Sequence, residues 1–448
     1  MKAPTELIAQ LPKTDLHVHL DGSLRISTLI DLARTYDVEL PSYTEDGLRQ
    51  LVFKPTYESL GDYLKGFRFT VAVLQQELAL EQVAYELAQD TQQEGVRYLE
   101  VRFAPQLHVH AHLDAITVIR AVDRGLRRAT QEFNQRASVV EGREPEFRYG
   151  IIVCAMRAFA AGSSEYFRDL LRVHRFAPEK EVFAAASQEA ARAAIRARDE
   201  FDLPVVGFDL AGQEDGYPAV DHKEAYQIAH RNFLMKTVHA GEAYGPESIF
   251  QAITELHADR LGHGLYLFEH DMITSPEIRD REAYVTALSQ YIADRRITVE
   301  VCLTSNLQTN PRLPDLSFHT LRKMNAARLS TTFCTDNRLI SSTTVTQEIC
   351  LAVEHLDLTP RQLKNSIIYG FKRSFLPGSY LDKRSYVRQI IDYFDQVWRD
   401  YATQHPDEPF CQLANRNRSL AQAEARATAL AQGLPFDEDD GLLDGSGD

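Results

Sequence analysis

Short apolar runs alternate with longer helical segments along most of the chain, and this alternation constrains the fold more than any other feature. Eight runs rich in apolar or β-branched residues recur in the order TDLHVHL (14–20), VRYLEVRF (96–103), YGIIVCAM (149–156), PVVGFDL (204–210), LMKTVHA (234–240), RLGHGL (260–265), ITVEVCL (297–303) and LSTTFCT (329–335). Strands that alternate with helices are typical of α/β proteins. Several runs are almost continuously apolar, which indicates parallel strands buried on both faces.

Eight such strands predict an α/β fold of the (β/α)8 TIM-barrel type. A doubly wound open sheet is the structural alternative, because periodicity does not show whether a sheet closes. Helical candidates between the runs include residues 23–38, 77–95 and 188–201, and the irregular, charged stretch 131–148 predicts an insertion or an extended helix end. After the eighth run, three segments predict additional C-terminal helices that close the domain: 346–359, 360–376 and 383–404.

We expect a single domain over residues 1–405, including these closing helices, although a length of 448 residues alone would suggest two or three domains. Residues 406–448 then form a C-terminal extension. Its last segment, PFDEDDGLLDGSGD, contains six acidic residues and no basic ones. Such a composition predicts a solvated, disordered acidic tail.

Charge and hydropathy narrow the choice of partner and compartment. The net charge of −15 disfavours a nucleic-acid partner, which would need clustered Lys and Arg, so we expect a small-molecule substrate. No segment resembles a membrane span, and MKAPTELIAQLPK lacks the apolar core of a secretory signal. The five cysteines are far apart and mostly lie in apolar runs, which indicates reduced, structural thiols in a cytoplasmic protein: Cys154, Cys302, Cys334, Cys350 and Cys411.

The first run contains a possible pair of metal ligands. His17 and His19 are two residues apart, so on a strand their side chains point to one face and can reach the same ion. Alone, the pair is weak evidence, because most histidines in such a pattern are ordinary core or surface groups.

Further polar residues fall at the ends of later runs. His239 ends the fifth run in VHAGEAYG, with Glu242 just beyond it; His263 lies in LGHG of the sixth run, and Asp336 follows the eighth in CTDNR. Taken singly, His263 could be a hydrogen-bonded core residue and Asp336 a helix cap. In a barrel, however, catalytic groups gather where the carboxyl ends of the strands meet. Their coincidence at this end favours a functional site.

Three histidines and an aspartate favour zinc or a similar divalent ion, with one position left open for water. A bound divalent ion lowers the pKa of water towards about 7 and so provides a nucleophile near neutral pH. The chemistry expected is therefore hydrolysis. Glu242 and His263 could divide the proton transfers that attack and leaving-group departure require.

The order and length of several motifs make the chain resemble the adenosine deaminase family. The motifs are LPKTDLHVHLDGSL, GVRYLEVRFAP, GFDLAGQE, VHAGE, RLGHGL, LTSN and CTDN, and they cover residues 10 to 345. The resemblance implies a zinc ion held by His17, His19, His239 and Asp336. It also implies that Glu242 protonates the purine ring nitrogen beside C6.

The resemblance implies further roles around the substrate. His263 orients or deprotonates the attacking water, Asp21 bonds the ribose 5′-hydroxyl, and the backbone of Gly212 approaches the purine ring. Together with His19 these residues form the expected substrate site. A glycine suits the approach at position 212, because the missing Cβ lets a ligand lie against the backbone, although a simple turn glycine is the alternative.

One position departs from the common family pattern. The family commonly has TDD where this chain has Thr335, Asp336 and Asn337. The Asn337 amide can donate to purine N7 without taking up a proton, and a helix-capping residue is the alternative.

The segment SLGDYLKGFRFTVAVL (59–74) resembles the family's helical segment over the pocket. Its Tyr63 and Phe67 are candidates for an apolar lid, although aromatic residues four apart on a helix are more often core.

The function expected from the resemblance is deamination of adenosine or 2′-deoxyadenosine, and several other functions are alternatives to it. An adenine or modified-adenosine deaminase would use the same chemistry, but Asp21 favours a nucleoside, since adenine deaminases tend to carry Glu there. The H-x-E and P-C-x-x-C signature of cytidine deaminases is absent, and GHG in RLGHGL lacks a dinucleotide-binding fingerprint. From another class, a non-catalytic scaffold or growth-factor-like relative is disfavoured by the intact ligand set. The oligomeric state is left open.

Overall fold

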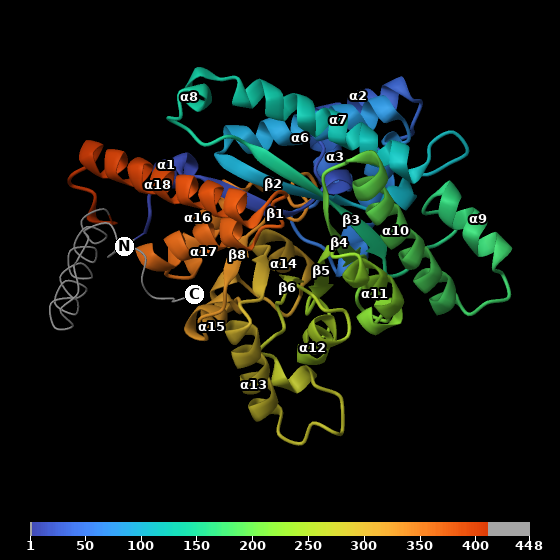
Figure 1. Cartoon of the computed structure of the whole chain (residues 1–448). Helices are drawn as coiled ribbons and strands as arrows, with labels where there is room; N and C mark the ends of the chain where they lie inside the picture. Colours follow the sequence, from blue (N-terminus) through green and yellow to red (C-terminus); the bar gives the residue numbers. More distant parts are fainter. Residues whose placement is uncertain (1, 411–448) are drawn as a thin grey trace.

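Eight parallel strands form one sheet whose order follows the sequence from β1 to β8 (Figure 1). In this computed structural model, which describes residues 2–410, the strands are β1 (Lys13–His19), β2 (Val96–Phe103), β3 (Arg148–Met156), β4 (Val205–Ala211), β5 (Met235–Ala240), β6 (Arg260–His263), β7 (Thr298–Val301) and β8 (Thr331–Phe333). Chain just beyond β8 pairs with β1, because the amide of His19 donates to the carbonyl of Asp336 at 2.7 Å. The barrel prediction is confirmed, and the open-sheet alternative is wrong.

Helices surround these strands (Figure 1). The described α-helices are α1 (Thr5–Gln10), α2 (Ile26–Thr35), α3 (Glu45–Leu51), α4 (Leu60–Leu64), α5 (Phe67–Val73), α6 (Glu77–Gln93), α7 (Ala115–Asn134), α8 (Ala137–Val140), α9 (Glu165–Val173), α10 (Glu179–Phe201), α11 (Lys223–Arg231), α12 (Pro246–Thr254), α13 (Arg281–Asp294), α14 (Leu303–Thr309), α15 (Leu321–Ala326), α16 (Val345–His355), α17 (Pro360–Arg373) and α18 (Tyr380–Gln404). Within residues 2–410, no helix has the length and apolar character needed to cross a membrane.

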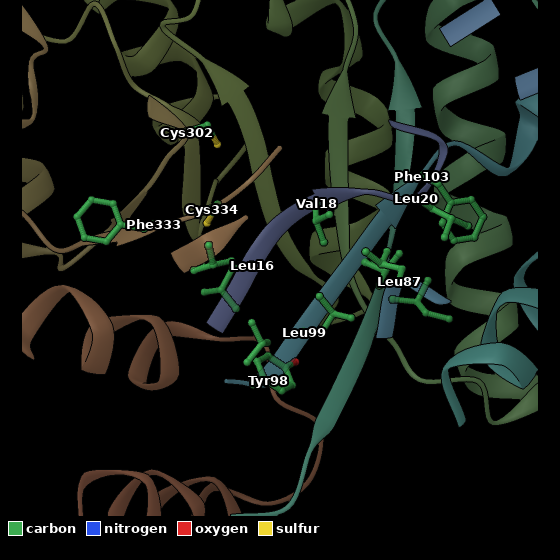
Figure 2. Packing of buried hydrophobic residues seen from close by; sticks show 14 of the residues in the cluster. Leu16, Val18, Leu20, Leu87, Tyr98, Leu99, Phe103, Cys302, Phe333 and Cys334 are labelled. Atoms are coloured by element: carbon green, nitrogen blue, oxygen red, sulfur yellow. The ribbon is translucent and has the colours of Figure 1, made fainter. Parts of the chain in front are cut away.

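Alternation along the strands separates two kinds of buried surface. Leu16 and Val18 of β1 belong to the apolar cluster between strands and helices, together with Leu99 and Phe103 of β2 (Figure 2). The intervening residues face the barrel interior, because successive side chains on a strand point to opposite faces. That interior is lined with charged groups, as described below. The apolar core therefore lies mainly outside the barrel wall.

The closing helices begin where the local sequence caps them. Thr359 and Gln362 form a capping box at the start of α17, and Ser379 and Asp382 form another at the start of α18. Such boxes satisfy backbone N–H groups that a helix start leaves without partners. The stretch 131–148, predicted as an insertion or an extended helix end, contains the end of α7 and the short α8.

The segment 59–74, which resembles a helical segment of the family, forms two helices. They are α4 and α5, with Lys65 and Gly66 between them. Glycine weakens a helix interior because it gains conformational freedom when the helix opens, which explains a break at this position. Four cysteines among the described residues are free thiols, and Cys154, Cys302 and Cys334 are buried. Cys411 and the predicted acidic tail lie outside the described residues.

Candidate functional site

Three histidines and one aspartate converge at the carboxyl end of the barrel strands. His17 and His19 come from β1, His239 from β5, and Asp336 from the loop after β8. One ligand atom from each lies within 4.8 Å of the other three, and all four residues are buried. The Nε2 atoms of His19 and His239 are 3.2 Å apart, and each of His17 and His19 places Nε2 at 3.4 Å from Oδ1 of Asp336.

Local backbone geometry brings Asp336 into this group. The residue lies three positions beyond β8 and has φ 59°, in the left-handed region that non-glycine residues seldom occupy. Its amide donates to the carbonyl of His17 at 2.7 Å, which fixes the turn against β1. Ser305 Oγ donates to Asp336 Oδ2 at 2.7 Å. The alternative of a helix cap is wrong, since Thr344 caps the next helix, α16.

Buried carboxylates orient two of the histidines. His17 Nδ1 lies 2.8 Å from Glu300 Oε2, and His239 Nδ1 lies 3.1 Å from Asp209 Oδ2. A histidine that donates its Nδ1–H to a carboxylate presents the lone pair of Nε2 to a ligand, which is the usual arrangement around a protein-bound metal. Arg102 on β2 joins the two carboxylates, at 2.9 Å from each.

The buried charges of this network do not balance. Arg260 contacts Glu300 at 2.6 Å and also pairs with Glu100, so the network extends across the barrel. It comprises two guanidinium groups and four carboxylates: Arg102, Arg260, Glu100, Asp209, Glu300 and Asp336. Although burial alone would favour protonation, His239 and Arg102 hold the pKa of Asp209 well below its ordinary value. The network therefore contains two more carboxylates than guanidinium groups.

The donor set fits a divalent cation on three further grounds. The Nε2 atom of His17 is buried without a hydrogen-bond partner, and such an atom costs free energy unless it binds a ligand. Imidazole nitrogens and a carboxylate oxygen are ligands that zinc accepts. A doubly charged ion between them would also neutralise the excess negative charge of the network.

Glu242 and His263 lie beside the cluster. His263 Nε2 is 3.7 Å from Glu242 Oε1, and both side chains are almost fully buried. Burial, followed by the charges of Asp336 and Glu214, raises the pKa of Glu242 well above its ordinary value, while Arg157 opposes this shift. The raised pKa favours the protonated carboxylic acid, which is the form that can donate a proton.

A second carboxylate holds the loop that carries Glu242. Glu214, in the loop after β4, accepts hydrogen bonds from four consecutive backbone amides, those of residues 241 to 244, at 2.6–3.0 Å. Ser248 Oγ of α12 donates a fifth bond at 2.5 Å. Because both oxygens of Glu214 only accept, the carboxylate fixes the path of the loop and places its negative charge near Glu242.

A pocket of about 910 Å³ opens above the cluster, and both Glu242 and His263 line it. Its wall includes Asp21, Gly212 and Asn337 as well as Phe67 and Met156. Gly212 has φ 98°, so the glycine is required by the backbone and leaves the pocket wall without a side chain there. Burial raises the pKa of Asp21 to about 7, and its Oδ1 has no partner within the protein.

The remaining predicted residues take distinct places around the pocket. The Asn337 side chain packs so closely against Gly22 that a Cβ on residue 22 would lie 1.9 Å from Asn337 Oδ1. Asn337 does not cap the next helix, α16, as the alternative predicts. Phe67 lies with its ring 6.5 Å from that of His19. Tyr63 is only 1% exposed and its hydroxyl lies 2.8 Å from Ser341 Oγ, so this residue forms part of the packed wall.

Reasoning from the sequence missed the supporting charges of the site. Four of these charged residues lie inside the apolar runs, whose pattern alone gives them no role beyond the strand: Arg102, Asp209, Arg260 and Glu300. Their signal was the occurrence of charges inside runs expected to be buried on both faces, since buried charges need partners. Glu214 stands within the GFDLAGQE motif, in which the resemblance implies a role only for Gly212.

The fold and the cluster together define a barrel protein with a candidate metal site at the carboxyl ends of its strands. A family model described as adenosine deaminase matches residues 12–393. The adenosine deaminase of Mycobacterium sp. (strain JLS) is 36% identical over 374 residues, covering 83% of this chain and 92% of the relative. The chain belongs to the adenosine deaminase family, and it is a hydrolase.

Solved structures share the fold at lower identity. An amidohydrolase from Burkholderia ambifaria with bound Zn has a TM-score of 0.70 at 18% identity, covering 89% of this chain and 94% of that one. The N6-methyl-AMP deaminase from Arabidopsis thaliana has a TM-score of 0.65 at 24% identity, covering 88% and 98%. At these identities the likeness concerns the fold, so it does not decide the substrate of this chain.

Proposed function

We propose that the chain is a zinc-dependent adenosine deaminase, which converts adenosine or 2′-deoxyadenosine and water into inosine or 2′-deoxyinosine and ammonia. The observation that carries this proposal is the group of four buried ligand atoms beside a carboxyl whose pKa is raised, at the base of a pocket. Family membership supplies the reaction type. His17, His19, His239 and Asp336 would hold one zinc ion per chain.

The residues around the ion divide the remaining work. When bound, zinc lowers the pKa of water and so supplies hydroxide as a nucleophile near neutral pH. Glu242 donates its proton to the purine ring nitrogen beside C6, which makes C6 more susceptible to attack. Hydroxide adds to C6. When the C6–N bond then breaks, the proton of the added hydroxyl passes to the departing amino group, so that ammonia leaves and a C6 carbonyl remains. His263 orients or deprotonates the attacking water.

Three residues would select the substrate. Asp21 bonds the ribose 5′-hydroxyl, a role that its unpartnered, buried Oδ1 supports. Gly212 leaves its backbone open to the purine, and the Asn337 amide donates to N7.

The contact between Asn337 and N7 can be tested with 7-deazaadenosine, which has carbon in place of N7. We expect this analogue to be a poorer substrate than adenosine. The penalty should shrink in Asn337→Ala; an equal penalty in both proteins would contradict the N7 contact.

A substrate panel tests the proposed reaction. We would follow release of ammonia or methylamine from adenosine, 2′-deoxyadenosine, adenine, AMP and N6-methyl-AMP, with metal content measured in the same preparation. Adenosine and deoxyadenosine should react fastest, and chelation should abolish turnover until zinc is restored. Preference for adenine or a nucleotide would replace the proposed substrate. Full activity in a metal-free preparation would exclude the proposed zinc chemistry.

A further inference from the structure

A chain of hydrogen bonds leads from the protein backbone to His263. It begins at Leu321, the first residue of α15, whose backbone N–H donates to Nδ1 of His319 at 3.1 Å. Since a backbone amide can only donate, Nδ1 of His319 must be the acceptor and carry no proton. Burial lowers the pKa of His319 to about 3, so its ring is neutral. The single ring proton of His319 is therefore on Nε2.

The next link fixes the orientation of an amide. His319 Nε2 lies 3.2 Å from Oδ1 of Asn306 in α14, and Asn306 Nδ2 lies 3.1 Å from Nδ1 of His263. The two ends of an amide are assigned from their partners. Turning the Asn306 amide over would set its NH₂ group against the Nε2–H of His319, with two donors facing each other. Asn306 must therefore accept from His319 and donate to His263.

The same reasoning determines the tautomer of His263. Its Nδ1 accepts from the Asn306 amide, so a neutral ring carries its proton on Nε2. A doubly protonated ring would place Nδ1–H against the Asn306 NH₂ group, which the geometry opposes. The Nε2 atom is buried without a protein partner, and the residue lines the pocket. His263 thus presents an N–H donor to whatever occupies the base of the pocket.

We infer that Asn306 and His319 are positioning residues that hold His263 as a fixed Nε2–H donor to the reacting oxygen, so that His263 orients the attacking water and does not deprotonate it. To act as a base at Nε2, the ring would need its proton on Nδ1, and Asn306 and His319 would both have to rearrange. This inference rests on the proposed function and decides between its two roles for His263.

Other charged groups around His263 do not supply an alternative way to set its tautomer. Glu242 faces Nε2 at 3.7 Å, beyond hydrogen-bond distance. The rings of His17 and His239 lie edge-on or tilted, with centroids 5.0 and 5.2 Å away, while Asp336 and Arg102 act through their charges. On the Nδ1 side, Asn306 is the partner among the described residues.

Nitrogen NMR of protein labelled with ¹⁵N-histidine tests the inference directly, because the two ring nitrogens of a neutral imidazole differ in whether they carry a proton. The His263 signals are identified by their loss in His263→Gln. Asn306→Asp replaces the donor next to Nδ1 with a carboxylate that can only accept, and Asn306→Ala removes the donor. Asn310→Asp is the matched control, since Asn310 Oδ1 accepts from Tyr266 and Arg312 without touching His263.

In the natural protein and in Asn310→Asp, we expect His263 to be protonated on Nε2 and unprotonated on Nδ1. In Asn306→Asp the proton should move to Nδ1, and in Asn306→Ala the two tautomers should mix. Metal content should be unchanged. At alkaline pH, where the ring is neutral, kcat of Asn306→Asp should fall about 100-fold, the effect of losing one preorganised donor, with little change in KM.

Three results would overturn the inference: a natural protein with His263 protonated on Nδ1, the same tautomer in all variants, or an Asn306→Asp variant with normal kcat despite the new tautomer. Should Asn306→Asp fail to fold, Asn306→Ala answers the same question through the tautomer mixture. The spectrum does not depend on turnover. A natural protein that deaminates no purine would therefore contradict the proposed function, while the tautomer would still decide whether the hydrogen-bond chain acts as inferred.

Discussion

At the scale of single residues, the raised pKa of Glu242 is the feature that most directly predicts catalysis. Burial, followed by the charges of Asp336 and Glu214, raises this pKa and so favours the carboxylic acid, which is the form that can donate a proton. Glu242→Gln keeps the shape but removes that proton, so we expect kcat to fall about 100-fold or more. Zinc content should stay at that of the natural protein. Near-normal turnover would assign the proton transfer to another residue.

Asp21 should act on binding more than on chemistry. Its Oδ1 is buried and unpartnered, and a ribose hydroxyl would satisfy it. Asp21→Ala should therefore raise KM for adenosine by the equivalent of roughly 1–3 kcal/mol, the usual effect of leaving a buried polar group without its partner. The same substitution should change KM for 5′-deoxyadenosine much less. Equal losses for both substrates would show that Asp21 does not contact the 5′-hydroxyl.

At the scale of elements, the loop between β5 and α12 depends on one carboxylate from another loop. Glu214→Gln replaces an acceptor of five hydrogen bonds with a group that has one accepting oxygen and an NH₂ donor. Hydrogen exchange of the amides of residues 241 to 244 should accelerate. In Ser248→Ala, which removes one bond and keeps the charge, these amides should stay protected.

The same substitution has a predicted effect on pH dependence. Asp336, Glu214, Arg157 and His263 face the Glu242 carboxyl, and the charge of Glu214 raises its pKa. Turnover falls as pH rises through that pKa, because the acid is then lost. Removing the charge in Glu214→Gln should move this fall to lower pH by about one unit, the scale of a neighbouring charge. A kcat profile unchanged from that of Ser248→Ala would contradict this effect.

Much of the barrel could be predicted because its elements have strong local signals. The runs that contain β1 and β2 begin and end within one residue of the observed strands, whereas the short β8 covers only three residues of its predicted run. The local sequence pattern does not determine how many residues of a strand pair with the neighbouring strand. The sequence likewise does not determine where the helical segment 59–74 divides into α4 and α5, since Gly66 alone lowers helix stability without determining a break.

The grouping of His17, His19, His239 and Asp336 was predictable from the sequence, but the groups that support them were not. His19, His239 and Asp336 stand at or just beyond the ends of their strands, where the fold places catalytic groups. Arg102 and Glu300, by contrast, gain their meaning only when β2 and β7 face each other across the barrel. The direction of the Asn306 amide depends on His319, thirteen residues further along, so that no local motif reveals it.

At the scale of the whole molecule, charge is distributed unevenly between the two sides of the barrel wall. Apolar side chains fill the space between strands and helices, while the interior contains ion pairs in which carboxylates outnumber guanidinium groups. Burying such an excess of carboxylates is costly, and a bound divalent ion would reduce that cost. Binding of the ion should therefore contribute to stability as well as to activity.

Thermal unfolding of metal-free and metal-loaded protein measures this contribution. At a free zinc concentration 100 times Kd, loading should stabilise the fold by about 2.7 kcal/mol. Asp336→Asn should lose most of that gain, because it removes a ligand of the proposed ion. Its metal-free form should melt below metal-free natural protein: although burial opposes it, His17, His263 and His19 hold the pKa of Asp336 far below its ordinary value and so stabilise its ionised form. Asp271→Asn is the control: its side chain is 88% exposed, so the same change of charge should leave the melting temperature and the gain from zinc almost unchanged. If Asp336→Asn gained as much from zinc as the natural protein, Asp336 would not be a ligand of the ion.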